Sequence, residues 1–351
     1  MTAPIPNPAP SPHLSVRPDW LALQREEILE PELPIVDAHH HLWDHTGNRY
    51  FVFDMADDIA SGHHVVATVG VECGAMYRAD AALARRPIGE TEFLSGMAAI
   101  SASGAYGPAR VCAGIVGHVD LRLGAAAGEL LQAHIAAGGG RFRGVRNSSV
   151  WHPDPAARAS LATPPPYLLR DAQFRAGFAE LAPLGLSFDA WLYHSQLAEL
   201  MELAQAFPQT TIVLNHAGGA NGVGPYAGRR EAVLAEWGAS MRELARCPNV
   251  FVKLGGFGMR LYGFDFAARE RPPSSHDLAA AWRPYVETCI EAFGAGRCMF
   301  ESNFPVDKGS TSYGVLWNAF KRLAADVSAH DKRALFSGTA ARVYRLQVPA
   351  P

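Results

Sequence analysis

Several common features are absent from the 351-residue sequence, and each absence excludes a class of protein. A net charge of −3 leaves no basic surface of the kind that binds nucleic acid. There is no apolar run of about 18 residues or more, so we expect no membrane span. The five cysteines are odd in number and form no CxxC pair, which favours a reduced, cytoplasmic setting over a disulfide framework. The expected partner is a small-molecule substrate, and the formation of a homo-oligomer is left as an open possibility.

Proline is distributed unevenly along the chain. Residues 1–34 hold eight of the 25 prolines, with neither a basic n-region nor an apolar h-region of a signal peptide. This composition predicts an N-terminal arm, residues 1–34, that is extended and has little regular structure. The alternative is a clasp that packs on a neighbouring subunit.

The rest of the chain has a hydrophobic content sufficient for a large core, since 48% of all residues are hydrophobic and 19% are charged. Short apolar runs alternate with helical patterns, and they occur at 35–38, 65–71, 111–116, 142–145, 186–192, 211–214, 250–254 and 297–300. Eight strand–helix units predict an α/β fold, the (β/α)8 TIM barrel, over residues 35–346. A doubly wound sheet is the competing architecture, but no Gly-rich phosphate fingerprint follows the first run.

Three connections are unusually long: residues 73–110, 147–170 and 255–275. Each follows the carboxyl end of an expected strand, the face on which barrel enzymes build their active sites. Long loops in a compact domain are usually functional. We therefore expect long βα loops to cover the active face.

The strongest chemical signal is Val36–Trp43, which reads VDAHHHLW. Residues two apart in a strand share a face, so Asp37, His39 and His41 are expected to point the same way and His40 the opposite way. Two imidazoles at this spacing can bind one divalent metal or one oxyanion.

Further polar residues lie at the expected carboxyl ends of the other strands. They are Glu72, His118, Arg146, Tyr193, His194, Asn215, His216, Lys253, Asn303 and Asp307. A single buried histidine is usually a structural group, but so many polar residues on one rim favour a functional site.

The motif VDAHHHLW resembles the first-strand motif of the amidohydrolase-2 branch of the amidohydrolase superfamily. The similarity continues through LSFDAWLYHSQL, IVLNHAG, VFVKLG, CMFESNFP and GTAARVYRL, and so spans about residues 35–346. The most similar members are sugar-lactone and 2-pyrone-4,6-dicarboxylate lactonases; metal-dependent decarboxylases are more distant. The resemblance implies a TIM barrel with a hydrolytic or decarboxylating site.

By this resemblance, His39 and His41 match the HxH pair of the family, and His194 matches a third metal ligand. His216 matches a histidine that acts in proton transfer or substrate binding, and Arg146 matches, more loosely, a basic residue that binds a carboxylated substrate. With three histidines a zinc ion would keep an open position for water.

The eighth strand departs from the family pattern. Where many relatives carry an Asp in a GSDWP-like motif, this chain has Asn303, and an amide cannot act as a general base. Three carboxylates could compensate: Glu301, one layer deeper on the same face, Asp307 in the following loop, and Glu72. Glu301 could instead be a structural partner of a buried Arg or His.

The expected activity is the opening of a lactone or related cyclic ester or amide by an activated water. Two alternatives stay open: a metal-dependent decarboxylase or hydratase of an aromatic or unsaturated acid, and a non-catalytic binding barrel. The cofactor would be Zn²⁺ or another divalent metal, with a metal-free mechanism as the alternative. We expect three groups of site residues: His216, Asp307 and Glu72 as catalytic residues; Arg146, Lys253, Tyr193, Asn303, His118 and Trp43 as substrate-binding residues; and His39, His41 and His194 as metal ligands.

Overall fold

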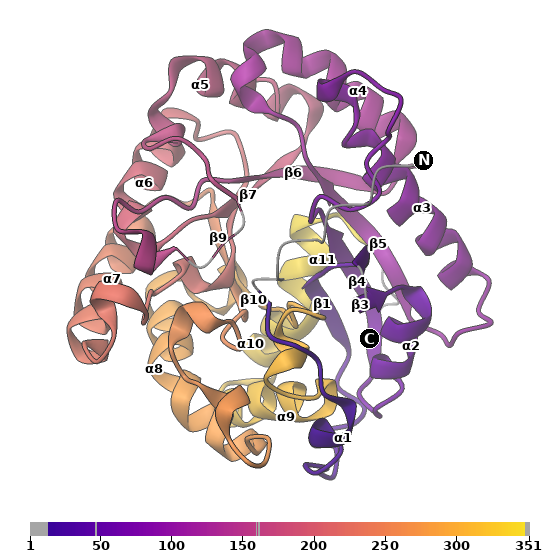
Figure 1. The fold of residues 1–351 in the computed structure, drawn as a ribbon, viewed down its shortest axis with the longest axis vertical. Coiled ribbons are helices and arrows are strands. Elements are labelled where there is room, and N and C mark those ends of the chain that lie inside the picture. Colours follow the sequence, from indigo (N-terminus) through magenta and orange to yellow (C-terminus); the bar gives the residue numbers. More distant parts are fainter. Residues whose placement is uncertain (1–12, 46–47, 159, 161, 348–351) are drawn as a thin grey trace, which may run out of the picture.

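Eight parallel strands form a single sheet in the computed structural model, which describes residues 13–45, 48–158, 160 and 162–347 (Figure 1). Each strand pairs with the next along the chain. The strands are β1 (Ile35–His40), β4 (Val65–Val71), β5 (Arg110–Gly117), β6 (Phe142–Ser148), β7 (Ser187–Trp191), β8 (Ile212–Leu214), β9 (Val250–Leu254) and β10 (Cys298–Phe300). All eight expected runs are strands, and the expected (β/α)8 barrel is confirmed.

The barrel closes where the segment after β10 meets β1. A parallel bridge joins His40 to Phe304, and the His41 amide donates to the Phe304 carbonyl at 2.7 Å. The Asn303 amide donates to the His39 carbonyl at 2.9 Å. This closure holds the histidine motif beside the eighth-strand segment, so the two most distinctive parts of the sequence become neighbours.

The outer layer is built from helices that follow the strands (Figure 1). The helices are α1 (Pro18–Leu21), α2 (Val52–Ile59), α3 (Ile88–Ala102), α4 (Ala127–Ala137), α5 (Ala172–Phe178), α6 (Leu197–Ala206), α7 (Arg230–Leu244), α8 (Ser275–Phe293), α9 (Tyr313–Leu323), α10 (Ala329–Arg333) and α11 (Thr339–Val343). The sequence patterns missed α2 and the small hairpin of β2 (Trp43–His45) and β3 (Asn48–Tyr50), which are short elements of eight, three and three residues.

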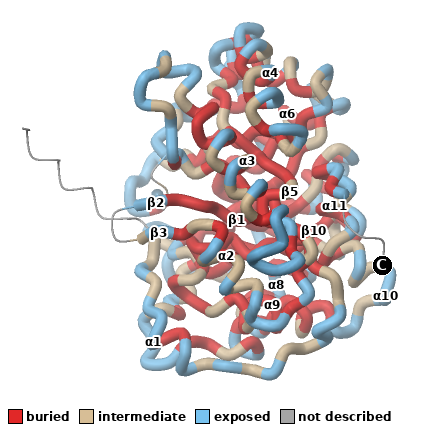
Figure 2. Tube along the Cα trace, turned by 90° about the vertical axis from the view of Figure 1, so that its right-hand side faces the viewer, coloured by how far each residue is buried: buried red, intermediate tan, exposed pale blue. Residues whose placement is uncertain are grey.

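The core has two parts, and Figure 2 shows the buried strands within an exposed outer layer. The larger part lies between the sheet and the surrounding helices. The smaller part fills the barrel interior, where Val36, Val69 and Met299 pack with Val343 and Tyr344 from the end of the chain. The C-terminal segment therefore supplies side chains to the barrel interior.

The described part of the N-terminal arm, residues 13–34, packs along the barrel of its own chain. Its only regular element is α1, as the composition predicted, while residues 1–12 lie outside the described residues. Glu26 accepts a hydrogen bond from the Ser275 amide at 2.7 Å, and the Leu29 amide donates to Asn318 at 2.9 Å. These contacts fix the arm to α8 and α9.

All five cysteines are free thiols: Cys73, Cys112, Cys247, Cys289 and Cys298. Within the described ranges, none of the helices combines the length and apolar character needed to cross a membrane.

Candidate active site

A pocket of about 480 Å³ opens at the carboxyl ends of the strands, the face predicted from the barrel rule. Its walls combine charged, aromatic and proline side chains, and include His13, Leu14, His41, Trp43, Glu72, Tyr77, His118, Arg146, Pro164, Pro165, Trp191, His216, Arg260 and Asn303. Seven of the site residues predicted from the sequence therefore line one cavity: His41, Trp43, Glu72, His118, Arg146, His216 and Asn303.

The histidine motif does not alternate as a regular strand would. The pairing of β1 with β4 shifts register between Asp37 and His40, and Asp37 accepts hydrogen bonds from the Ser302 amide and from Tyr313 on α9. The expectation that Asp37 shares a face with His39 and His41 is therefore wrong, because the irregularity breaks the two-residue period. His40 contacts Thr68 at 2.8 Å, away from the pocket, as expected.

His39 and His41 are fully buried or nearly so, and their Nε2 atoms lie 3.1 Å apart. His41 Nδ1 is 2.9 Å from the Val71 carbonyl, which can only accept, so His41 Nε2 carries a lone pair. Burial lowers the pKa of both imidazoles well below 6.5, and Lys253 and Arg146 lower it further for His39 and His41 respectively. Both residues are thus neutral imidazoles at neutral pH.

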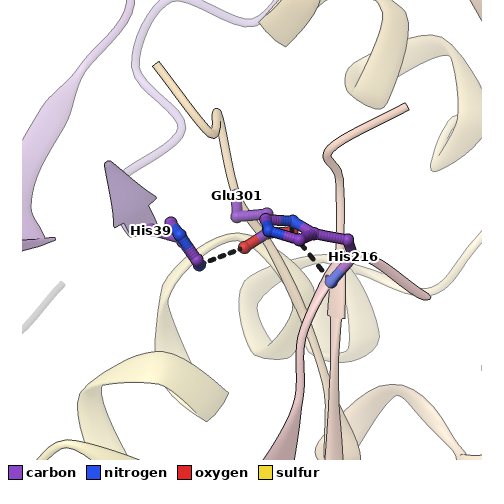
Figure 3. A group of neighbouring side chains, drawn as sticks. All are labelled: His39, His216 and Glu301. Carbon is purple, nitrogen blue, oxygen red and sulfur yellow. Dashed lines mark hydrogen bonds and ion pairs between the residues drawn. The ribbon is translucent and has the colours of Figure 1, made fainter. Parts of the chain in front are cut away.

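Glu301 lies between two of the predicted histidines, His39 and His216 (Figure 3). Its carboxylate is fully buried, with Oε1 2.6 Å from His216 Nδ1 and Oε2 3.0 Å from His39 Nδ1. The His216 amide also donates to Oε1, at 3.2 Å. Because the carboxylate accepts from Nδ1 of His216, the Nε2 lone pair is left for the pocket that His216 lines.

Two glycines after β9 make room for this group. A Cβ atom on Gly255 would lie 2.4 Å from Glu301 Cγ, and one on Gly256 would lie 2.5 Å from His216 Nδ1. Gly256 also has a φ of +68°, a conformation that side chains other than glycine rarely adopt. The sequence LGGFG is therefore a packing requirement of the site.

Lys253 does not reach the pocket, contrary to the expectation that it binds substrate. It is fully buried, forms an ion pair of 2.6 Å with Asp189, and lies 3.3 Å from His39 Nδ1. Tyr344 donates to the same Asp189 carboxylate at 3.0 Å. An ammonium group can only donate, so His39 Nδ1 accepts from Lys253. Lys253 therefore fixes the tautomer and the position of the His39 ring.

Arg146 and Glu72 both line the pocket and form a pair. Arg146 Nε donates to Glu72 Oε1 at 2.7 Å, and Arg146 Nη1 lies 3.3 Å from His39 Nε2. His118 Nδ1 lies 3.1 Å from the Arg146 carbonyl. One oxygen of Glu72 is therefore committed to holding the guanidinium in place, and the expectation of Glu72 as a catalytic carboxylate is replaced by a positioning role.

Asn303 and Asp307 form a second pair, of which only Asn303 lines the pocket. Asn303 Nδ2 donates to Asp307 at 2.8 Å, and the other Asp307 oxygen accepts from the Gly258 amide at 2.8 Å. Asn303 Oδ1 has no hydrogen-bond partner among the described residues. Burial raises the pKa of Asp307 to about 8. Asp307 thus orients the amide and does not face a substrate.

Two further expected residues, His194 and Tyr193, lie away from this pocket. His194 Nδ1 accepts from the Asn221 amide at 3.2 Å, and its ring contacts Tyr226. Tyr193 is buried beside Trp191. The structure therefore does not bring His194 to His39 and His41 as a third ligand. The short helical turn His194–Gln196 follows the end of β7, and neither His194 nor Tyr193 lines the pocket.

Three of the described residues are placed so that they could hold a metal ion, and they differ from the expected ligand set. His39, His216 and Glu301 offer ligand atoms that all lie within 4.8 Å of one another. Glu301 Oε2 has no hydrogen-bond partner among the described residues and faces the nitrogen of His39 to which Lys253 donates. These two electron-rich atoms, Glu301 Oε2 and His39 Nδ1, lie 3.0 Å apart. Two histidine nitrogens and a carboxylate are ligands that suit a dication such as zinc.

Sequence reasoning missed several residues of the pocket, among them Trp191, His13 and Leu14. Trp191 is two residues before Tyr193, at the end of β7, and its place at the carboxyl end of a strand could have indicated it. No pattern in the sequence could have placed His13 or Leu14, because the arm has no period that fixes its path.

A parallel barrel with histidines, an arginine and carboxylates at the carboxyl ends of its strands defines an enzyme of the TIM-barrel class. The chain belongs to the amidohydrolase family, whose model (Amidohydrolase) matches residues 36–346.

Individual relatives extend over nearly the whole chain. "Uncharacterized protein y4mH" of Sinorhizobium fredii is 35% identical and covers 90% of this chain and 99% of its own. An L-fucono-1,5-lactonase of Burkholderia multivorans is 28% identical, covering 90% of this chain and 97% of its own. A solved amidohydrolase from Burkholderia multivorans with bound zinc has a TM-score of 0.67 at 25% identity, covering 89% of this chain and 99% of its own.

The buried carboxyl of Asp307 gives a pH-dependent prediction. Its raised pKa means that the native state binds a proton more tightly than the unfolded chain, where the carboxyl titrates near its ordinary value of 3.8. This stabilisation is complete below about pH 4 and is lost as the pH rises towards 8. The variant Asp307→Asn does not titrate there. Urea unfolding should therefore show its stability relative to the unmodified protein rising by at least about 1 kcal/mol from pH 4 to pH 8. A difference that stays constant with pH would contradict this.

The glycine at 256 gives a second prediction, concerning stability and the position of His216. Gly256→Ala should destabilise the fold by more than Gly140→Ala, because both positions have positive φ but only Gly256 has atoms within 4 Å of an added Cβ. The control measures the backbone cost alone, about 1–2 kcal/mol. Chemical denaturation checks both variants, and equal losses would mean that the collision with His216 is relieved without cost.

Proposed function

We propose that this enzyme hydrolyses a lactone, opening the ring ester to a hydroxy acid. The observation that carries the proposal is the buried pair of Glu301 and His216 at the floor of a pocket that also holds Arg146. A named lactonase among the relatives, matched over 97% of its length, supports the same reaction type.

In this mechanism His216 is the general base. Its Nδ1 proton is held by Glu301, so Nε2 can take a proton from a water molecule as the water oxygen attacks the ester carbonyl. Glu301 stabilises the imidazolium that forms, as a carboxylate does in other histidine-based sites. The ring C–O bond then breaks, and His216 returns the proton to the leaving alkoxide oxygen.

Arg146 supplies positive charge for the oxygen of the tetrahedral intermediate. The guanidinium is preorganised by Glu72, so little reorganisation is needed when charge develops on the carbonyl oxygen. Asn303 Oδ1 offers an acceptor to a hydroxyl group of the substrate, in an orientation that Asp307 sets. In these assignments His216 is the base, Arg146 binds the developing oxyanion, and Asn303 binds a substrate hydroxyl group.

A divalent metal fits the group of His39, His216 and Glu301, which would hold it. When bound, such a metal supplies Lewis-acid polarisation of a carbonyl or of water. While His216 Nδ1 donates to Glu301, His216 would hold the metal through Nε2, the nitrogen that carries the lone pair.

The activity can be tested with L-fucono-1,5-lactone and a panel of other aldonolactones, with acid release followed by a pH indicator. The variants Glu301→Gln and His216→Asn should each lower kcat by about 100-fold or more, since they remove the base or its partner. His194→Asn is the matched control, since His194 lies outside the pocket, and should retain activity. If Glu301→Gln hydrolyses the lactone normally, the assigned base is wrong. Release of CO₂ from aromatic acids, with no lactone hydrolysed, would favour the decarboxylase alternative.

The metal ligands can be tested separately from activity. After chelation and dialysis, zinc binding measured by calorimetry should be lost in His39→Ala and in Glu301→Gln, and kept in His194→Ala. The reason is that only the first two residues belong to the buried group. Loss of zinc binding in His194→Ala alone would instead support the ligand set expected from the family resemblance.

A further inference from the structure

The described part of the N-terminal arm begins in the wall of the active-site pocket. In Figure 1 the indigo segment runs from α1 towards the middle of the barrel. Its first two described residues, His13 and Leu14, line the same cavity as His41, Arg146 and His216. A segment that precedes the barrel in the sequence therefore forms part of the wall around the reacting groups.

His13 is connected to the reacting groups through a stack of rings. Its imidazole lies parallel to Trp43, with ring centroids 5.4 Å apart and an interplanar angle of 8°. Trp43 stacks in turn on His41, at 6.0 Å and 13°. His13 is thus two ring spacings away from His41, too far to act on the ester carbonyl but still within the pocket.

The arm is held in this position by contacts along its length. Leu14 packs so closely on Gly309 that a Cβ atom there would lie 2.4 Å from Leu14 Cβ. Arg17 donates to the Ala267 carbonyl at 2.6 Å, and Trp20 Nε1 donates to the Arg269 carbonyl at 3.1 Å. The wall that carries His13 is therefore anchored to the loops after β9 and β10 and is not a loose end.

We infer that His13 is a specificity-determining residue, which contacts the ring substituents of a hydroxylated lactone whose carbonyl lies at Arg146 and His216. This inference rests on the proposed lactonase function. An imidazole offers a hydrogen-bond donor and an acceptor, which suit the hydroxyl groups of a sugar-type lactone. An unsubstituted lactone has no group that could span the distance from His41 to His13, so the contact discriminates between the two substrates.

The test compares two substrates across three proteins. His13→Ala should lower kcat/KM for a hydroxylated aldono-1,5-lactone about tenfold, and should leave kcat/KM for δ-valerolactone within about twofold. Leu23→Ala is the matched control, because Leu23 is an exposed arm residue outside the pocket, and it should change neither value. Equal melting temperatures would show that all three proteins are folded.

Two failures can be told apart. If the unaltered enzyme hydrolyses neither lactone, the proposed function falls, and the inference about His13 falls with it. If the unaltered enzyme hydrolyses the hydroxylated lactone but His13→Ala affects both substrates equally, or neither, the inference alone is overturned. Deletion of residues 1–14 should reproduce the substrate-dependent loss, since it removes the same wall while keeping Trp20 and Glu26 as anchors.

Discussion

The buried carboxylate of Glu301 is the constraint on which the rest of the site depends. An ionised group removed from water is costly unless hydrogen bonds and opposite charges replace its hydration. Here His216 supplies two hydrogen bonds to one oxygen, while the other oxygen lies 3.0 Å from His39 Nδ1 and has no hydrogen-bond partner among the described residues. The neighbouring backbone must approach closely to enclose the group, which is why Gly255 and Gly256 follow β9. The histidine that faces the pocket thus takes its tautomer from a carboxylate that the substrate does not reach.

Charge below the pocket is arranged in a second buried network. Tyr344 donates to Asp189, Asp189 pairs with Lys253, and Lys253 lies against His39. Each group in this series is a hydrogen-bond or ion-pair partner of the next. The completely buried Lys253 therefore has the carboxylate of Asp189 to compensate its charge. Burial is the main reason why the pKa of His39 is lowered, and the positive charge of Lys253 lowers this pKa further. Stability and site electrostatics are therefore carried by the same side chains.

The fold could be predicted from the sequence because buried parallel strands are nearly continuous apolar runs, and all eight were present. The rim could be predicted as well, since Arg146, His216 and Asn303 each follow such a run. Two features of the site could not be predicted from the sequence. The irregular pairing of β1 changes which side chains share a face, and no propensity indicates a register shift. His194 contacts Asn221 and Tyr226 and does not line the pocket, although a residue at that place in the chain reads like the other site histidines.

The packing of Tyr344 inside the barrel has a consequence for how far a substitution can act. Tyr344 lies beyond the eighth strand and donates to Asp189, while Asp189 pairs with Lys253 and Lys253 lies against His39. A phenylalanine in place of Tyr344 would keep the ring but remove the hydroxyl donor from Asp189. The position of His39 therefore depends on a residue that does not line the pocket.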